Sequence, residues 1–423
     1  MLNIKDRIPL FPIKSLLSFL VFTEVFYFVG PINYQYQAPF LTALFFVAIN
    51  VALYKGYMSG LGSYKKRRTR DLSLSTIHHL ILVGLIISLV SLAMQMGTDM
   101  LSPSAIANKF VYALQNSGDV YHEKLENSRT TVMTYVFMLL APIRFAAMCI
   151  GVYSWSKLSS KYKILVGLIL FIDLFGWVTS GTRKGLMDDV LIIGYLSILA
   201  RPVLLNDRKR RRELTIAMLT LLGLFLFYFL VSNLSRGGKE MSEMELEDLS
   251  NIRQLYKTSL SPVLVFSLAG IEGYLCQGYR ALDYALASFV YEGYVCFTFG
   301  FGNNWFFINL FEHLAPGLDI LGNTYQGYLS RYGIDPMINW HSAYVWFAND
   351  VTFIGVPFLL YLIGRFFAKV WLDAYYRVKI SSVPLSCLFI IMIFYFFANN
   401  QVLSFSMITF VVTLFLYKTR MRF

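Results

Sequence analysis

Residues 76–96 read TIHHLILVGLIISLVSLAMQM, a segment without a single Asp, Glu, Lys or Arg. A helix of about 20 apolar residues is long enough to cross the roughly 30 Å hydrocarbon layer of a bilayer. Similar segments recur along the chain, in which 57% of the residues are hydrophobic and 15% are charged. One water-soluble core cannot bury this much apolar surface, so the composition indicates a protein that places it against lipid.

Ten apolar segments reach the length of a membrane span, and the first of them is expected to remain as an uncleaved helix because no cleavage-site pattern follows it. They lie at 14–31, 38–55, 76–96, 131–152, 163–180, 187–204, 214–233, 350–370, 384–399 and 403–418. The sequence therefore predicts an all-α, polytopic membrane protein with about ten transmembrane helices. The number rises to twelve if part of residues 258–312 also crosses.

The distribution of positive charge predicts the orientation. Six segments that alternate with pairs of spans hold 25 of the 37 Lys and Arg residues, including the runs KKRR at 65–68 and RKRRR at 208–212. The positive-inside rule then places both termini in the cytoplasm and residues 234–349 outside. The net charge of +12 is explained by anchoring near anionic lipid, and no nucleic-acid partner is expected.

Three parts follow from this topology. Residues 1–233 form the first seven transmembrane helices, 234–349 form a large periplasmic loop, and 350–423 form the last helices. The loop is rich in aromatic residues and glycine, so it is expected to be structured. Its stretch 258–312 is apolar enough to dip into the membrane as a hairpin or to lie along the surface, and the sequence leaves both possibilities open.

Several classes of activity are disfavoured by missing motifs. The chain has no Walker A sequence, no G-x-G-x-x-G, no H-E-x-x-H and no G-x-S-x-G, which argues against nucleotide-driven work and serine hydrolysis. The four cysteines lack metal-site spacing and are expected to pack as apolar side chains. No metal and no other cofactor is expected.

A basic turn, SGTRKG at 180–185, is the first candidate site. It places Arg183 and Lys184 beside backbone N–H groups near a helix start, which favours phosphate binding. The alternative is a polar turn whose cations extend to lipid headgroups. Further arginines are predicted outside the membrane, where the planar guanidinium suits a diphosphate. These are Arg236, Arg253, Arg280 and Arg331. The alternative for each is a salt-bridged or solvated residue, and Glu272, Asp283 and Glu292 lie near Arg280 in the sequence.

Residues 323–355 are the second candidate site. They contain Tyr325, His341 and the pair Asn349–Asp350, which leads into the next apolar segment. A neutral imidazole can take a proton from a hydroxyl near neutral pH, so His341 is a candidate general base. The alternative is a histidine that makes a structural hydrogen bond.

The turn at 180–185 and the run from Asn323–Thr324–Tyr325 through His341–Ser342–Ala343–Tyr344 to residues 350–355 (DVTFIG) resemble the O-antigen polymerase family, Wzy, and the related O-antigen ligases. These are integral-membrane glycosyltransferases with a GT-C-like helical fold. The resemblance rests on these two stretches and on the architecture of many spans with a large late outer loop.

The resemblance implies transfer of a glycan chain from undecaprenyl diphosphate to the terminal sugar hydroxyl of another lipid-linked repeat unit, at the periplasmic face of a bacterial inner membrane. It implies a catalytic role for His341 and Asp350. It also implies binding of the diphosphate or substrate by Arg183, Lys184, Arg236, Arg280, Arg331 and Tyr325. The implied partners are the lipid-linked oligosaccharide, membrane lipid and a chain-length-regulating membrane protein.

Two alternatives remain. A ligase would use the same donor with the lipid A core as acceptor. A flippase or transporter would need polar side chains along several spans, whereas the spans here carry few charges, among them Glu24, Arg144 and Asp173.

Overall fold

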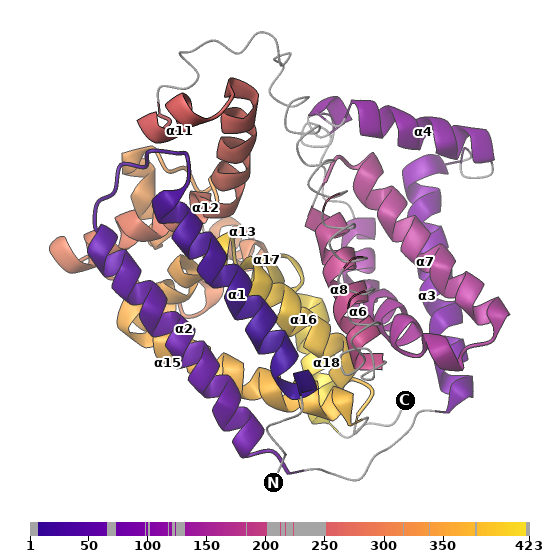
Figure 1. The fold of residues 1–423 in the computed structure, drawn as a ribbon. Coiled ribbons are helices and arrows are strands. Elements are labelled where there is room, and N and C mark those ends of the chain that lie inside the picture. The colour runs from indigo at the N-terminus through magenta and orange to yellow at the C-terminus, as the bar shows by residue number, and fades with distance from the viewer. Residues whose placement is uncertain are drawn as a thin grey trace. The chain divides into compact units, whose positions relative to one another are not determined.

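The structure is a computed structural model that describes residues 7–65, 73–97, 99, 102–116, 118–120, 123, 132–182, 184–200, 212, 216, 223, 251–315, 317–337, 339–376 and 379–419. Within these residues the regular structure is helical, apart from one isolated bridge between Ile32 and Ile252 (Figure 1). The predicted all-α class is confirmed for this part of the chain.

The chain divides into two compact units. The first comprises Met1–Lys65, Glu245–Leu372 and Leu388–Met407, and the second comprises Lys66–Met244, Asp373–Cys387 and Ile408–Phe423. Each unit is therefore assembled from segments far apart in the sequence. The predicted division at residues 234 and 349 is one of membrane topology, and it stays a prediction.

Six described helices are long and apolar enough to cross a membrane, as in a multi-pass membrane protein. They are α1 (Arg7–Val29), α2 (Pro39–Gly62), α3 (Leu74–Met96), α6 (Val132–Tyr153), α7 (Ser160–Thr179) and α15 (Ala343–Tyr375). Each matches one of the ten predicted segments.

The other four predicted spans are not among these six long helices. The segment at 187–204 corresponds to α8 (Lys184–Ala200), and the segment at 214–233 lies outside the described residues except for Ile216 and Gly223. The last two segments correspond to shorter apolar helices, α16 (Ser382–Phe394) continued by η6 (Tyr395–Phe397), and α18 (Met407–Lys418), with α17 (Gln401–Phe405) between them. The total of ten spans stays a prediction.

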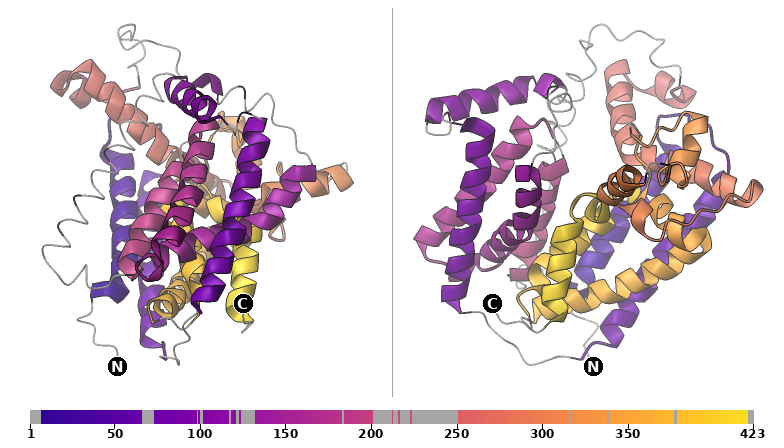
Figure 2. Two further views of the ribbon diagram at one scale, coloured as in Figure 1. Left: turned by 90° about the vertical axis from the view of Figure 1, so that its right-hand side faces the viewer. Right: turned by 180° about the vertical axis from the view of Figure 1, so that it is seen from behind.

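Residues 258–312 do not form a hairpin of two spanning helices. They contain α12 (Pro262–Tyr291), which follows the short α11 (Gln254–Ser259), and then η4 (Phe301–Asn303) and α13 (Trp305–Leu314). A ten-residue helix rises only about 15 Å, half the thickness of the hydrocarbon layer. Two views show α12 crossing the α1–α2 pair (Figures 1 and 2).

Charged side chains from this region hold the connection between α1 and α2. Arg253 donates hydrogen bonds to the carbonyl oxygens of Phe28 and Ile32, at the C-terminal end of α1. Asp283 of α12 accepts from the backbone N–H groups of Gln37 and Ala38, just before α2 begins. A cation at a helix C-terminus and an anion at a helix N-terminus both complement the helix dipole.

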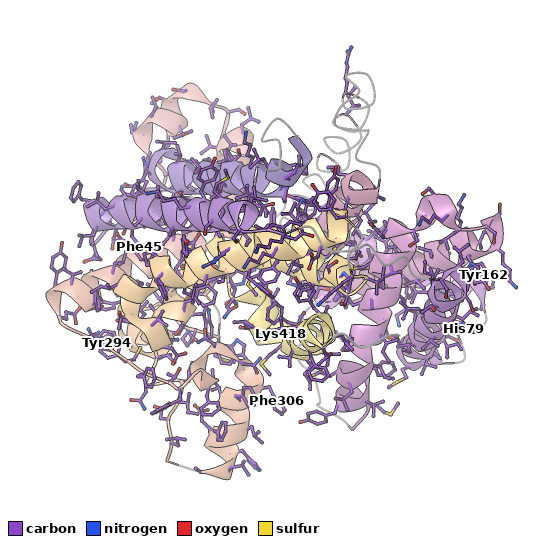
Figure 3. All side chains as sticks on the ribbon, turned by 90° about the horizontal axis from the view of Figure 1, so that it is seen from below. Phe45, His79, Tyr162, Tyr294, Phe306 and Lys418 are labelled. Atoms are coloured by element: carbon purple, nitrogen blue, oxygen red, sulfur yellow. The ribbon has the colours of Figure 1, made fainter. Side chains whose placement is uncertain are left out.

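Glycines allow α2 to approach α15 closely. A Cβ atom added at Gly56 would lie 2.0 Å from the carbonyl oxygen of Tyr361, and one at Gly60 would lie 2.4 Å from that of Arg365. These two glycines form a G-x-x-x-G sequence, a spacing that brings the backbones of membrane helices together. Nearer the start of α2, Phe45 packs edge-on against Tyr344 and Phe353 of α15 (Figure 3).

The second unit contains α3, α4 (Pro103–Gln115), α6, η2 (Trp155–Lys157), α7, α8 and most of α18. Arg144 of α6 pairs with Asp173 of α7 at 2.5 Å, so the two charges within these spans neutralise each other. Cys149 and Cys387 of this unit are buried, as are Cys276 and Cys296 of the first, and all four are free thiols. Two of these thiols also donate hydrogen bonds, Cys276 to the Thr23 carbonyl oxygen and Cys296 to the Asn349 side chain, so the predicted packing role holds in part.

The contact between α2 and α15 can be tested with two glycines of one helix. Gly56→Ala should lower the thermal midpoint in detergent, because the added methyl group overlaps backbone atoms and such overpacking costs about 1–3 kcal/mol. Gly62→Ala, at the last residue of the same helix, is the control, since a Cβ there meets nothing within 4 Å. Equal midpoints for the two variants would contradict this packing.

Candidate functional site

A carboxylate of α15 organises the loop that precedes α13. Asp350 accepts hydrogen bonds from the backbone N–H groups of Thr298 and Gly300, each at 3.0 Å, and from the Thr298 hydroxyl at 2.9 Å. Its second oxygen accepts from the Asn303 side-chain amide at 2.6 Å. Four donors thus converge on one carboxylate from a stretch about 50 residues earlier in the chain.

The neighbouring residue, Asn349, holds two further segments. Its amide oxygen accepts from the Tyr325 backbone N–H at 3.0 Å and from the Cys296 thiol at 3.4 Å. Its amide nitrogen donates to the side chain of Gln326 at 2.9 Å, at the start of α14 (Tyr325–Tyr328). The pair Asn349–Asp350 therefore joins residues 296–303 and 325–326 to the beginning of α15.

This geometry favours a positioning role for Asp350. A carboxylate offers about four acceptor sites, two on each oxygen. Three of the four hydrogen bonds go to Oδ1 of Asp350 and one to Oδ2, so Oδ1 is fully used and Oδ2 keeps one site. A general base needs a free lone pair facing the acceptor hydroxyl. The predicted catalytic role of Asp350 stays a prediction, and the contacts observed here assign the side chain a structural function.

His341 lies immediately before α15 and is 1% exposed. Its Nδ1 is 3.1 Å from the carbonyl oxygen of Asn339, and its Nε2 is buried without a partner among the described residues. Burial lowers the pKa of His341 to about 4, so the ring is neutral near pH 7. The neutral ring could accept a proton, but neither of its nitrogens is exposed. The catalytic role of His341 stays a prediction that requires the ring to become accessible.

Arg331 lies in η5 (Leu329–Tyr332) and forms an ion pair with Glu292. Its guanidinium also stacks on the Tyr328 ring at 3.5 Å. Hydrogen bonds from the hydroxyls of Tyr328 and Tyr332, together with the Arg331 contact, lower the pKa of Glu292 to about 2. The predicted substrate-binding cation is thus partly exposed but already paired, and Glu292 is its partner.

Tyrosine rings extend this cluster. Tyr294, labelled in Figure 3, stacks on Tyr328 at 3.6 Å. Tyr325 is fully buried, contacts the Tyr294 ring and donates its hydroxyl to the Tyr294 carbonyl oxygen. Tyr325, a predicted substrate-binding residue, is therefore a buried packing partner of Tyr294.

Arg280 of α12 belongs to the same region. Its guanidinium lies 5.8 Å from the centre of the Tyr284 ring, which is 5.5 Å from the Tyr332 ring. It is half-buried, and no carboxylate of the described residues lies within ion-pair distance of it. Arg280 and Arg331, two arginines predicted to bind substrate, thus lie on one tyrosine-rich surface. This surface consists of Tyr284, Tyr294, Tyr328 and Tyr332.

The basic turn at 180–185 belongs to the other unit. Lys184 is paired with Asp188 at 2.6 Å, one helical turn further along α8. Arg183 and Arg236 lie outside the described residues, so their predicted roles stay predictions. Local spacing could have suggested the Lys184–Asp188 pair, because side chains four residues apart meet on one face of a helix.

Glu272 is a residue whose role the sequence did not reveal. This fully buried side chain of α12 accepts a hydrogen bond from the Ile32 backbone N–H at 2.6 Å. Its carboxyl group occupies the space that a Cβ atom at Gly30 would fill, since such an atom would lie 2.4 Å from the Glu272 Cδ. The G-P sequence at 30–31 was the only signal of this close approach.

No protein-family model, curated protein or solved structure matches this chain. Within the described ranges, no group of three or more His, Cys, Asp or Glu side chains is arranged to hold a metal ion.

The buried position of His341 predicts a pH-dependent stability. On folding, the pKa of His341 falls from its usual 6.5 to about 4, so the folded state binds a proton less readily than the unfolded state. The neutral histidine therefore contributes about 3 kcal/mol of stability above pH 6.5, and this contribution is lost as the pH falls from 6.5 to 4. In His341→Gln the thermal midpoint should therefore vary less over this pH range. His313→Gln, at an exposed histidine of α13, should behave as the wild type. An unchanged pH profile in His341→Gln would rule out the buried neutral ring.

Proposed function

We propose that the protein is a glycosyltransferase that polymerises lipid-linked oligosaccharides. The chain would transfer a glycan from undecaprenyl diphosphate to the terminal sugar hydroxyl of another lipid-linked repeat unit. The acceptor oxygen forms a bond to the anomeric carbon, the bond from that carbon to the phosphate oxygen breaks, and the lipid diphosphate leaves with the electron pair. The proton of the acceptor hydroxyl would pass to a base, for which His341 is the candidate. The proposal draws on the resemblance of residues 180–185 and 323–355 and on the multi-pass helical architecture.

The contacts of Arg280 are the observation that supports this proposal most directly. Among the candidate cations that the structure describes, Lys184 is paired with Asp188 and Arg331 with Glu292. Arg253 uses its donors on backbone carbonyl oxygens and on the Tyr36 hydroxyl. No carboxylate of the described residues lies within ion-pair distance of Arg280, so its half-buried guanidinium would offer its donors to an anionic ligand. Its planar donor geometry suits the oxygens of a diphosphate.

The chemical task of such a cation is to stabilise the departing charge. Positively charged donors aimed at an oxygen that becomes more negative in the transition state can contribute several kcal/mol. Arg280 would bind the diphosphate, while the Tyr328, Tyr332 and Arg331 cluster would lie beside the sugar portion. Tyrosine rings with polar hydroxyls can contact both faces and edges of a sugar.

The proposal includes a location. By the positive-inside rule, both termini would lie in the cytoplasm of a bacterial cell and this site would lie at the outer face of the inner membrane. Lipid-linked repeat units would then meet the site from the plane of the membrane. A chain-length-regulating membrane protein would be a further partner.

Substitution of Arg280 tests this function. Arg280→Ala should lower polymer formation by purified protein on synthetic lipid-linked repeat units roughly a hundredfold or more, a loss typical of removing a donor to a developing anion. Arg280→Lys should recover only part of the activity, because an ammonium group lacks the planar donor geometry. Rates are normalised to folded protein.

Lys257→Ala is the matched control, since it removes a cation of α11 that lies outside the tyrosine surface. Normal activity in Arg280→Ala would remove this arginine from the site. Cells that lack the protein should carry single repeat units on the lipid A core, whereas unattached polymer would instead indicate a ligase.

A further inference from the structure

The side chains of residues 295–299 alternate between two environments. Cys296 and Thr298 are buried and bind Asn349 and Asp350. Val295, Phe297 and Phe299 face the opposite way and are 56%, 58% and 76% exposed. Their alternation follows the two-residue period of an extended chain. One edge of this stretch is therefore polar and bound to α15, and the other is apolar and uncovered.

Phe299 is held outward by its backbone. It has a φ of 53°, a left-handed conformation that is uncommon for residues other than glycine and that persists only where the surroundings enforce it. Contacts on both sides of Phe299 enforce this conformation, because the N–H groups of Thr298 and Gly300 both donate to Asp350. The exposure of this aromatic ring is thus imposed by specific contacts.

The apolar edge adjoins an exposed apolar face of α15. Directly after Asp350, the residues Val351, Ile354, Phe358 and Leu362 are exposed, and Ile354 is 80% exposed. Ile354, Phe358 and Leu362 follow the break in the helix at Thr352, and their four-residue spacing places these three on one face. This helix is one of the six that can cross a membrane, so the exposed face is suited to contact lipid.

We propose that Val295, Phe297 and Phe299 form a lipid anchor that inserts into the bilayer surface beside α15. The occupant of this surface is phospholipid, at the boundary between the headgroups and the acyl chains. Continuity with the apolar face of α15 supports this choice over a protein partner, since Asp350 attaches the anchor directly at the start of that face. The proposal does not depend on the glycosyltransferase function.

The polar contacts of the anchor fit this environment. A backbone N–H group without a partner is costly in an apolar medium. Asp350 supplies acceptors for the N–H groups of Thr298 and Gly300, on either side of the exposed ring. The Phe297 and Phe299 rings also pack edge-on at 4.6 Å, so they present one joined apolar surface.

Photocrosslinking in a bilayer tests the anchor. The full-length protein carries p-benzoylphenylalanine at position 299 and is reconstituted into vesicles of phosphatidylethanolamine and phosphatidylglycerol. After irradiation, intact-mass measurement detects phospholipid adducts. Position 354, on the exposed face of α15, is the positive control. Position 337 is the matched control, because Met337 is 73% exposed and apolar but precedes the start of α15.

The expected result is a phospholipid adduct at positions 299 and 354 and no adduct at position 337. If the variant at position 299 does not fold, the same photoreactive residue at position 297 makes the same test. The absence of lipid adducts at both 297 and 299, with labelling at 354, would overturn the proposal. Crosslinks from these positions to a second copy of the chain, in place of lipid, would overturn it as well.

Discussion

The Asp350 carboxylate and the Asn349 amide are the constraint on which the arrangement of residues 294–332 depends. Between them they bind the loop at 296–303 and the start of α14, and both side chains come from the first turns of a helix long enough to cross a membrane. The hydrogen bonds to the charged Asp350 each contribute about 1.5–3 kcal/mol. A helix long enough to span a membrane thereby sets the position of the loops and short helices that precede it.

The tyrosine-rich surface follows from this attachment. Asn349 fixes the backbone at Tyr325, and η5, which carries Arg331, follows within the next few residues. The loop on the other side of the attachment contains Tyr294, which stacks on Tyr328. The two halves of the surface therefore share one support. The break in α15 at Thr352, with a φ of 58°, lies two residues beyond Asp350 and separates the attached helical turns from the remaining length of the span.

The sequence predicted the helical class and six of the spans because apolar length is a local property. It identified Asn349–Asp350, Arg280, Arg331 and His341 as notable, but not what each one contacts. The partners of Asp350 lie about 50 residues earlier, and Glu292 lies 39 residues before Arg331. Contacts over such distances are set by packing, which no local pattern encodes. The same reason explains why Arg253 and Asp283, which bind the ends of α1 and α2, could not be separated from substrate-binding residues in advance.

Hydrogen–deuterium exchange of the Thr298 and Gly300 backbone amides tests the central role of Asp350 most directly. In Asp350→Ala, exchange at both amides should accelerate about tenfold or more, because removal of a charged acceptor worth over 1.4 kcal/mol lowers the cost of opening by at least that amount. Asp335→Ala, at a carboxylate that accepts from Met337 only two residues away, should leave these amides unchanged. Wild-type protection of both amides in Asp350→Ala would contradict this account of the fold.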